Sequence, residues 1–115
     1  MIKREQLSRI HQLSCAQAYE IIKAKNADYG ASEDALRNFR LVEQMNVPME
    51  VGILTRMADK LARIGKLVTT PGGPSVKDET VDDTILDMIN YAIILRAAIA
   101  ERHPEEYLKK LLEVK

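Results

Sequence analysis

Apolar residues recur along this chain at the spacing of helices rather than strands. Over residues 3–27 they follow steps of three and four, which predicts one amphipathic helix. The same spacing predicts a shorter helix over residues 32–45, a third that Pro48 opens, a fourth over residues 78–101 and a short last helix from Pro104. Since no segment alternates apolar and polar residues, the pattern predicts an all-α fold: a helical bundle of four main helices plus a short C-terminal helix.

Each long helix is expected to bury one apolar stripe. The expected stripes are Leu7, Ile10, Ser14, Ala18, Ile21 and Ile22 in the first helix, Leu54, Met57, Leu61, Ile64 and Val68 in the third, and Val81, Ile85, Met88, Ile89 and Ala92 in the fourth. Residues 91–100 are apolar almost all round, and only Arg96 interrupts them. A helix that is apolar on every side needs partners on every side. Those partners are either other helices of this chain or further copies in a homo-oligomer.

Composition narrows the class of protein. The 115 residues are expected to form a single domain, 1–115, and 17 Lys and Arg balance 17 Asp and Glu. Zero net charge argues against sequence-independent nucleic-acid binding, which needs a basic excess. Cys15 is the single cysteine, so we expect a packing residue, no disulfide and a reducing compartment. No signal region and no run of ~18 apolar residues is present, so the expected location is cytoplasmic, with no membrane partner.

The fourth predicted helix has an unusual acidic face. Glu79, Asp83 and Asp87 are spaced four residues apart, Asn90 follows three residues later, and no Lys or Arg lies among them. At this spacing the four side chains point the same way, where like charges repel by a few tenths of a kcal/mol per pair. One interpretation is a solvated acidic face at a helix start. The other is a Mg²⁺ site, because this cation prefers oxygen ligands and keeps waters that carry phosphate.

Two cationic segments complement these acids. Arg56, Asp59 and Arg63, with Lys60 on the flank, lie away from the apolar stripe of the third helix. They form either a surface ion pair or a wall that faces the carboxylates across a cleft and binds phosphate. Residues 23–30 carry Lys23, Lys25 and Tyr29, which suit phosphate and base contacts or, equally, a basic helix end before a Gly stop. Phosphate-loop, dinucleotide-turn and Cys/His metal motifs are absent from the sequence.

An ordered series of these residues resembles a known family. The series is Asp28-Tyr29-Gly30, Asn38-Phe39, Asp59-Lys60-x-x-Arg63, Glu79, and Asp83-x-x-x-Asp87-x-x-Asn90-Tyr91. It resembles the nucleotide-modification-associated domain family, type one, which is common in bacteriophages and prophages, over roughly residues 18–100. The resemblance implies a nucleotide-linked role. Under it, the expected nucleotide-binding residues are Lys25, Asp28, Tyr29, Asn38, Lys60, Arg63, Asn90 and Tyr91.

The chain is more distantly similar to all-α nucleoside triphosphate pyrophosphatases, the MazG and dimeric dUTPase group. In that group two acidic pairs hold Mg²⁺, and here only Asp59 and Asp87 match, with Asp83 and Glu79 as possible substitutes. One hypothesis is therefore a Mg²⁺-dependent nucleotide hydrolase. In it Asp59, Glu79, Asp83 and Asp87 bind the metal, and Glu79, Asp83 and Asp87 serve catalysis. The alternatives are an oligomeric protein that sequesters a signalling nucleotide without turnover, and an adaptor with solvated charged faces.

Overall fold

The computed structural model describes residues 1–28, 33–72, 81–103 and 105–113, and every regular element in these ranges is helical. In chain order the elements are α1 (Arg4–Asp28), α2 (Arg37–Arg40), the 3₁₀ helix η1 (Leu41–Met45), α3 (Met49–Thr69), α4 (Val81–Arg102) and α5 (Glu105–Leu112). No strand occurs in the described part of the chain. The predicted all-α class is confirmed.

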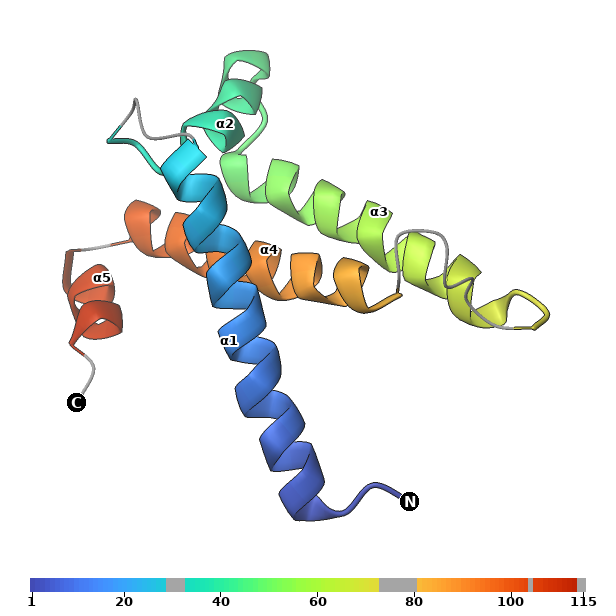
Figure 1. Ribbon diagram of the computed structural model, residues 1–115. Coiled ribbons are helices and arrows are strands. Elements are labelled where there is room, and N and C mark those ends of the chain that lie inside the picture. The colour runs from blue at the N-terminus through green and yellow to red at the C-terminus, as the bar shows by residue number, and fades with distance from the viewer. Residues whose placement is uncertain (29–32, 73–80, 104, 114–115) are drawn as a thin grey trace.

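Helices α3 and α4 form an antiparallel pair, and α1 crosses α4 on one side of that pair (Figure 1). The first half of α1 projects beyond the crossing, so that the N-terminus lies far from the other helices. Helices α2 and η1 lie at the beginning of α3, beside the end of α4, and α5 follows α4. Helix α1 therefore contacts the α3–α4 pair only where it crosses α4.

The hydrophobic core is small and lies at the end of the pair where α3 begins. Its fully buried members are Met49 and Ile53 of α3 and Ala98 of α4, and Leu36 closes it from the segment before α2. Phe39, Met57, Tyr91, Ile94 and Leu95 pack around these residues, partly buried. Because Ile53 and Met49 are the largest apolar side chains removed from water, they carry much of the hydrophobic stabilisation.

Several predicted helix boundaries are confirmed and one helix is not. The first helix differs from the prediction by one residue at each end, and Pro48 precedes α3 as its N-cap. The predicted helix over residues 32–45 is instead the four-residue α2 followed by η1. The physical reason is a turn, in which the Leu36 backbone N–H donates to Asp34 Oδ1 at 3.1 Å and delays the helix start. Asn46 then ends η1 in the left-handed conformation, with φ of 60°.

The expected apolar stripes are wrong for parts of all three long helices. Leu54, Leu61 and Val68 of α3 are 49%, 61% and 56% exposed, although Met57 and Ile64 are half-buried as expected. In α4 the expected core residues Ile85 and Ala92 are exposed, as are Leu7 and Ile10 in the projecting half of α1. The buried face of α3 is the adjacent one, which runs from Met49 through Ile53. The expected stripe of α3 thus has one half-buried edge, at Met57 and Ile64, and one exposed edge.

Two arginines link the α2–η1 segment to the C-terminal end of α4 through ion pairs. Arg40 donates from Nε and Nη2 to the two carboxylate oxygens of Asp34 at 2.6 and 2.9 Å, and it also binds both oxygens of Glu101. Arg102 donates to Glu43 and, at 2.5 Å, to Glu50 Oε1. The Arg40 guanidinium lowers the pKa of Asp34 and Glu101, and these carboxylates raise the pKa of Arg40 in turn.

Cys15 is exposed in α1, and its Sγ lies 3.9 Å from His11 Nδ1. The expectation that Cys15 is a packing residue is therefore wrong, because it lies on the projecting half of the helix. Among the helices of the described residues, none is long and apolar enough to cross a membrane.

Candidate functional site

A pocket of about 260 Å³ lies where α1 crosses the α3–α4 pair. Its walls come from α1, from the segment through α2, from α3 and from the middle of α4. The lining residues are Ile22, Lys25, Ala35, Leu36, Asn38, Phe39, Arg56, Asp87, Asn90, Tyr91, Ile93, Ile94 and Ala97. Positions 87, 90, 91 and 94 of α4 share one helical face, which explains why these four side chains reach the same pocket.

One part of the pocket is aromatic and apolar. The rings of Phe39 and Tyr91 meet edge to face, with centroids 6.3 Å apart and planes at 88°. The guanidinium carbon of Arg56 lies 5.1 Å from the centre of the Phe39 ring, within the range of a cation–π contact. Arg56 therefore holds a positive charge beside the aromatic wall and keeps Phe39 oriented.

The other part of the pocket is charged and centres on Asp87. Lys60 Nζ lies 3.2 Å from Asp87 Oδ2, and Lys25 Nζ lies 4.0 Å from Asp87 Oδ1. The Asp87 and Lys60 side chains are about three-quarters buried, whereas Lys25 is half exposed. Two ammonium groups therefore lie beside one carboxylate, and the guanidinium of Arg56 lines the same pocket. Such a site carries an excess of positive charge and favours an anionic ligand.

Asn90 also has a structural role. Its side chain is 7% exposed, and its Nδ2 donates to the backbone carbonyl of Ala18 in α1 at 3.1 Å. Ala18 itself is buried, so this bond lies inside the crossing of α1 and α4. Asn90 thus fixes the position of α1, and with it the position of Lys25 at the pocket.

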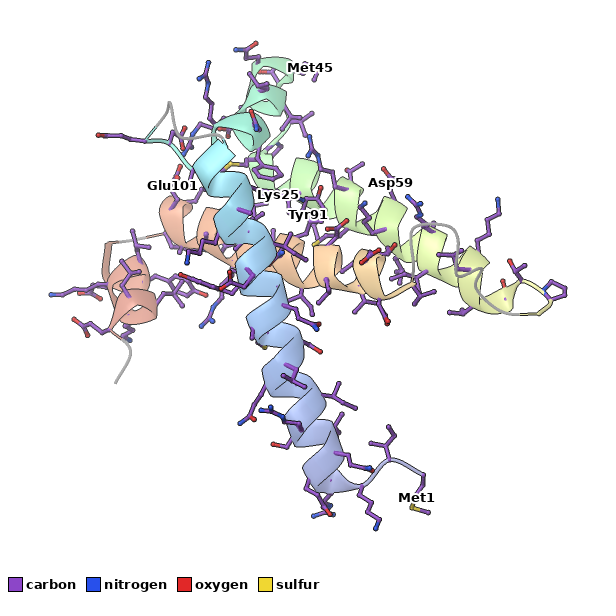
Figure 2. All side chains as sticks on the ribbon, in the orientation of Figure 1. Met1, Lys25, Met45, Asp59, Tyr91 and Glu101 are labelled. Atoms are coloured by element: carbon purple, nitrogen blue, oxygen red, sulfur yellow. The ribbon has the colours of Figure 1, made fainter. Side chains whose placement is uncertain are left out.

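The structure brings together part of the predicted site. Lys25, Asn38, Asp87, Asn90 and Tyr91 all line the pocket, and Lys60 reaches it through Asp87. Figure 2 shows Lys25 and Tyr91 at the crossing of α1 and α4, with Asp59 further along α3. Of the mixed-charge residues named on α3, Lys60 contacts a carboxylate of α4, that of Asp87.

Other predicted residues do not line this pocket. Asp59, Arg63 and Asp83 are exposed, and none of them is part of its wall. The predicted residues Tyr29 and Glu79 and the side chain of Asp28 lie outside the part of the chain that the structure describes. Their roles stay predictions.

The described residues alone do not complete the predicted Mg²⁺ site, because its ligand Glu79 lies outside them. Within residues 1–28, 33–72, 81–103 and 105–113, no three His, Cys, Asp or Glu side chains lie close enough to hold one ion. Asp87 faces two ammonium groups rather than a second carboxylate. A metal at this position would have to displace Lys60, so the described donor set suits an anion better than a cation.

Phe39 and Arg56 line the pocket, although Phe39 was not among the expected binding residues and Arg56 was expected only as part of the charged wall on α3. Phe39 is the single phenylalanine of the chain, in a sequence poor in aromatic residues. Arg56 lies four residues before Lys60, on the same helical face. The rarity of phenylalanine and the spacing of Arg56 and Lys60 can both be seen in the sequence. Only the packing of α2 against α3 brings Phe39 and Arg56 together.

The fold and the pocket define a small all-α protein with a ligand-sized hollow at the crossing of its helices. The chain belongs to the family described as nucleotide modification associated domain 1, whose model matches residues 25–99. The match includes every residue that lines the pocket except Ile22. Comparison with curated proteins and with solved structures gives no significant match. The more distant similarity to pyrophosphatases therefore stays a prediction.

Proposed function

We propose that the pocket at the crossing of α1 and α4 binds a nucleotide. The observation that carries this proposal is the division of one pocket into an aromatic part and a cationic part. A nucleotide has the same division, because its base is flat and weakly polar and its phosphates are anionic. The family to which the chain belongs is described by its association with nucleotide modification, which agrees with this ligand class.

In the proposed complex the base occupies the aromatic part of the pocket. Phe39 and Tyr91 offer ring faces and edges, and stacking on such rings contributes about 1–3 kcal/mol per base in other nucleic-acid-binding proteins. Asn38, from α2, supplies an amide that can both donate to and accept from a base edge. The volume of about 260 Å³ is slightly below the usual range for ligand pockets, which favours a mononucleotide over a dinucleotide.

The phosphates occupy the cationic part. Lys25 and Lys60 already point their ammonium groups at Asp87, so both are in position before a ligand arrives. Phosphate oxygens then take a share of these donors while Asp87 continues to orient them. Arg56 adds a planar group that can donate two parallel hydrogen bonds to one phosphate.

Equilibrium binding to a panel of mononucleotides, measured by isothermal titration calorimetry, tests the proposal. Lys25→Gln should weaken binding about tenfold, because it removes one partly exposed charge-assisted contact. Lys23→Gln is the matched control, since Lys23 is exposed two residues earlier and does not line the pocket. Equal loss in both variants, or no nucleotide binding by the wild type at millimolar concentrations, would contradict the proposal.

The base site has its own matched pair. Tyr91→Leu removes an aromatic wall of the pocket, whereas Tyr19→Leu removes an aromatic residue that is 60% exposed elsewhere on α1. We expect the first substitution to weaken nucleotide binding and the second to leave the affinity unchanged. An unchanged affinity in Tyr91→Leu would place the base somewhere else.

A second candidate function is Mg²⁺-dependent hydrolysis of the bound nucleotide. The supporting observation is that Asp83 lies one turn before the pocket residue Asp87 on α4, although it is not itself part of the pocket wall. Incubation of a nucleotide pool with and without Mg²⁺, followed by chromatography of bound and free fractions, separates the candidates. Products that appear only with the metal, and that Asp83→Asn abolishes without loss of binding, support hydrolysis. One nucleotide recovered intact supports sequestration, and neither signal favours the adaptor.

A further inference from the structure

The outward-facing side of α3 carries a regular apolar stripe. Its six residues are Val51, Leu54, Ala58, Leu61, Gly65 and Val68, at alternating steps of three and four. This is the spacing of the two seam positions in a coiled coil, where every such residue packs into a facing helix. All six residues are exposed, and a Cβ atom added at Gly65 would have no described neighbour within 4 Å beyond the adjoining helix backbone. We call these six residues the α3 stripe.

The bare residues of α4 lie on the same side of the helix pair. At about 100° per residue, the α3 stripe is centred about 110° round the helix from the core residue Ile53. On α4, Ile85 and Ala92 are about 140° and about 120° from the core residue Ala98, in the same rotational sense. Because the two helices are antiparallel, equal rotations in one sense bring both sets to one side of the pair. The opposite sense leads to Arg56 and Asn90, which do line one pocket together.

The α3–α4 pair therefore has two unequal sides. Helices α1 and α2 cover one side and enclose the pocket there. The other side carries the α3 stripe together with Ile85 and Ala92 of α4, which are all exposed, and among the described elements α3 contacts only α4, α2 and η1. An antiparallel pair with one bare apolar side is half of a four-helix bundle.

The exposed area is large enough for a stable interface. The chain exposes 9296 Å², whereas a compact monomer of 13.0 kDa exposes about 6,300 Å². Its radius of gyration is 16.6 Å, against about 13 Å for a compact chain of this length. The projecting half of α1 accounts for part of the excess and the bare side of α3–α4 for another part. Permanent dimers bury about 2,000–5,000 Å² in total, which this excess can supply.

We propose that two copies of this chain pack through the α3 stripes and the adjoining faces of α4, and so form a four-helix bundle with two-fold symmetry. The occupant is a second copy because the face is self-complementary: large residues such as Leu54 and Leu61 alternate with Ala58 and Gly65, where a facing helix can approach closely. The pockets lie on the outer sides of this dimer. The proposal therefore does not depend on the identity of the ligand.

Size-exclusion chromatography with light scattering, over micromolar to hundred-micromolar protein, tests the assembly. We expect the wild type at twice the mass of the 13.0-kDa chain. The double variant Leu54→Asp, Leu61→Asp should run as a monomer with its helical circular dichroism retained, because both side chains are about half exposed within one chain. Its dissociation constant should rise at least about a hundredfold, since the dimer would bury unpaired charges.

The matched control is Lys66→Asp, which lowers the net charge by the same two units. Lys66 is exposed and lies about 110° round the helix from the centre of the stripe, away from the positions that flank a coiled-coil seam, so this variant should remain dimeric. If the double stripe variant loses its helical signal, the milder Leu61→Ser, which adds no charge, replaces it. A wild type that is monomeric throughout the concentration range overturns the proposal, and so does a folded stripe variant that still dimerises.

Discussion

Ile53 and Leu54 are neighbours in α3 with opposite environments. Ile53 is fully buried in the core, whereas Leu54 is 49% exposed. Ile53→Ala deletes three buried carbon atoms and leaves a cavity beside Met49 and Ala98. Such substitutions cost about 2–5 kcal/mol, a large part of the roughly 5–15 kcal/mol that stabilises a domain. We expect Ile53→Ala to be among the most damaging single truncations in this chain.

Leu54→Ala should cost much less within one chain. About half of the leucine side chain is already in water, so its truncation loses about 1 kcal/mol or less and leaves no enclosed cavity. If Leu54 also packs in a dimer, the additional loss must depend on protein concentration, because dissociation does. The loss from Ile53→Ala should be present at every concentration.

Urea denaturation followed by circular dichroism measures both effects. The unfolding midpoint should fall far more in Ile53→Ala than in Leu54→Ala, with similar slopes if the unfolded states are alike. The comparison is made at several protein concentrations, so that the part due to assembly is separated. If Leu54→Ala were as damaging as Ile53→Ala at the lowest concentration, the assignment of inner and outer faces to α3 would be refuted.

The remaining predictions concern the ion pairs of Arg40, the crossing of α1 and α4, and the thiol of Cys15. Because Arg40 lowers the pKa of Asp34 and Glu101, the stabilisation from their ion pairs is complete above the ordinary pKa values of 3.8 and 4.5 and is lost as the pH falls below them. Arg40→Gln should therefore make the thermal unfolding temperature depend less on pH in this acid range. An unchanged pH dependence would argue against this role of Arg40. Asn90→Ala should cost about 1–3 kcal/mol by thermal denaturation, because a buried hydrogen bond to α1 is lost, and a neutral result would refute that role. Cys15 should react with a thiol reagent as fast in the folded protein as in urea, and strong protection would show that α1 is covered.

Helical spacing was enough to predict the class of fold and most helix ends. Pro48 and the three-and-four rhythm of α1 are local signals, and the structure agrees with them. The start of α2 was missed because the turn between Asp34 and Leu36 competes with a helix that propensity alone would begin earlier.

Spacing could not identify the buried side of α3. This helix has two apolar faces, one through Ile53 and one through Leu54 and Leu61, and the second has the more regular period. Period shows only that a face packs against something, not that the partner belongs to the same chain. The expected stripe therefore joined residues of the exposed face to Met57 and Ile64 at the edge of the buried one, whereas the fully buried residues of α3 are Met49 and Ile53.

The candidate site was predictable where it depends on one helix and not where it depends on three. Asp87, Asn90 and Tyr91 share a face of α4, so their meeting could be inferred from spacing. The contact of Asp87 with Lys60 agrees with the predicted charged wall. The approach of Arg56 to Phe39 depends on how α2 packs against α3, which no local pattern specifies.

The attachment of α2 and η1 has a consequence for how this family can diversify. The segment supplies Asn38 and Phe39 to the pocket, yet it is held largely at its margins, by Leu36 and by the arginines at positions 40 and 102. A change at Asn38 alters the pocket lining and leaves the contacts of Phe39 with Tyr91 of α4 and Arg56 of α3 in place. Laboratory evolution for a new ligand should therefore accumulate substitutions in this short stretch first, while the anchors stay constant.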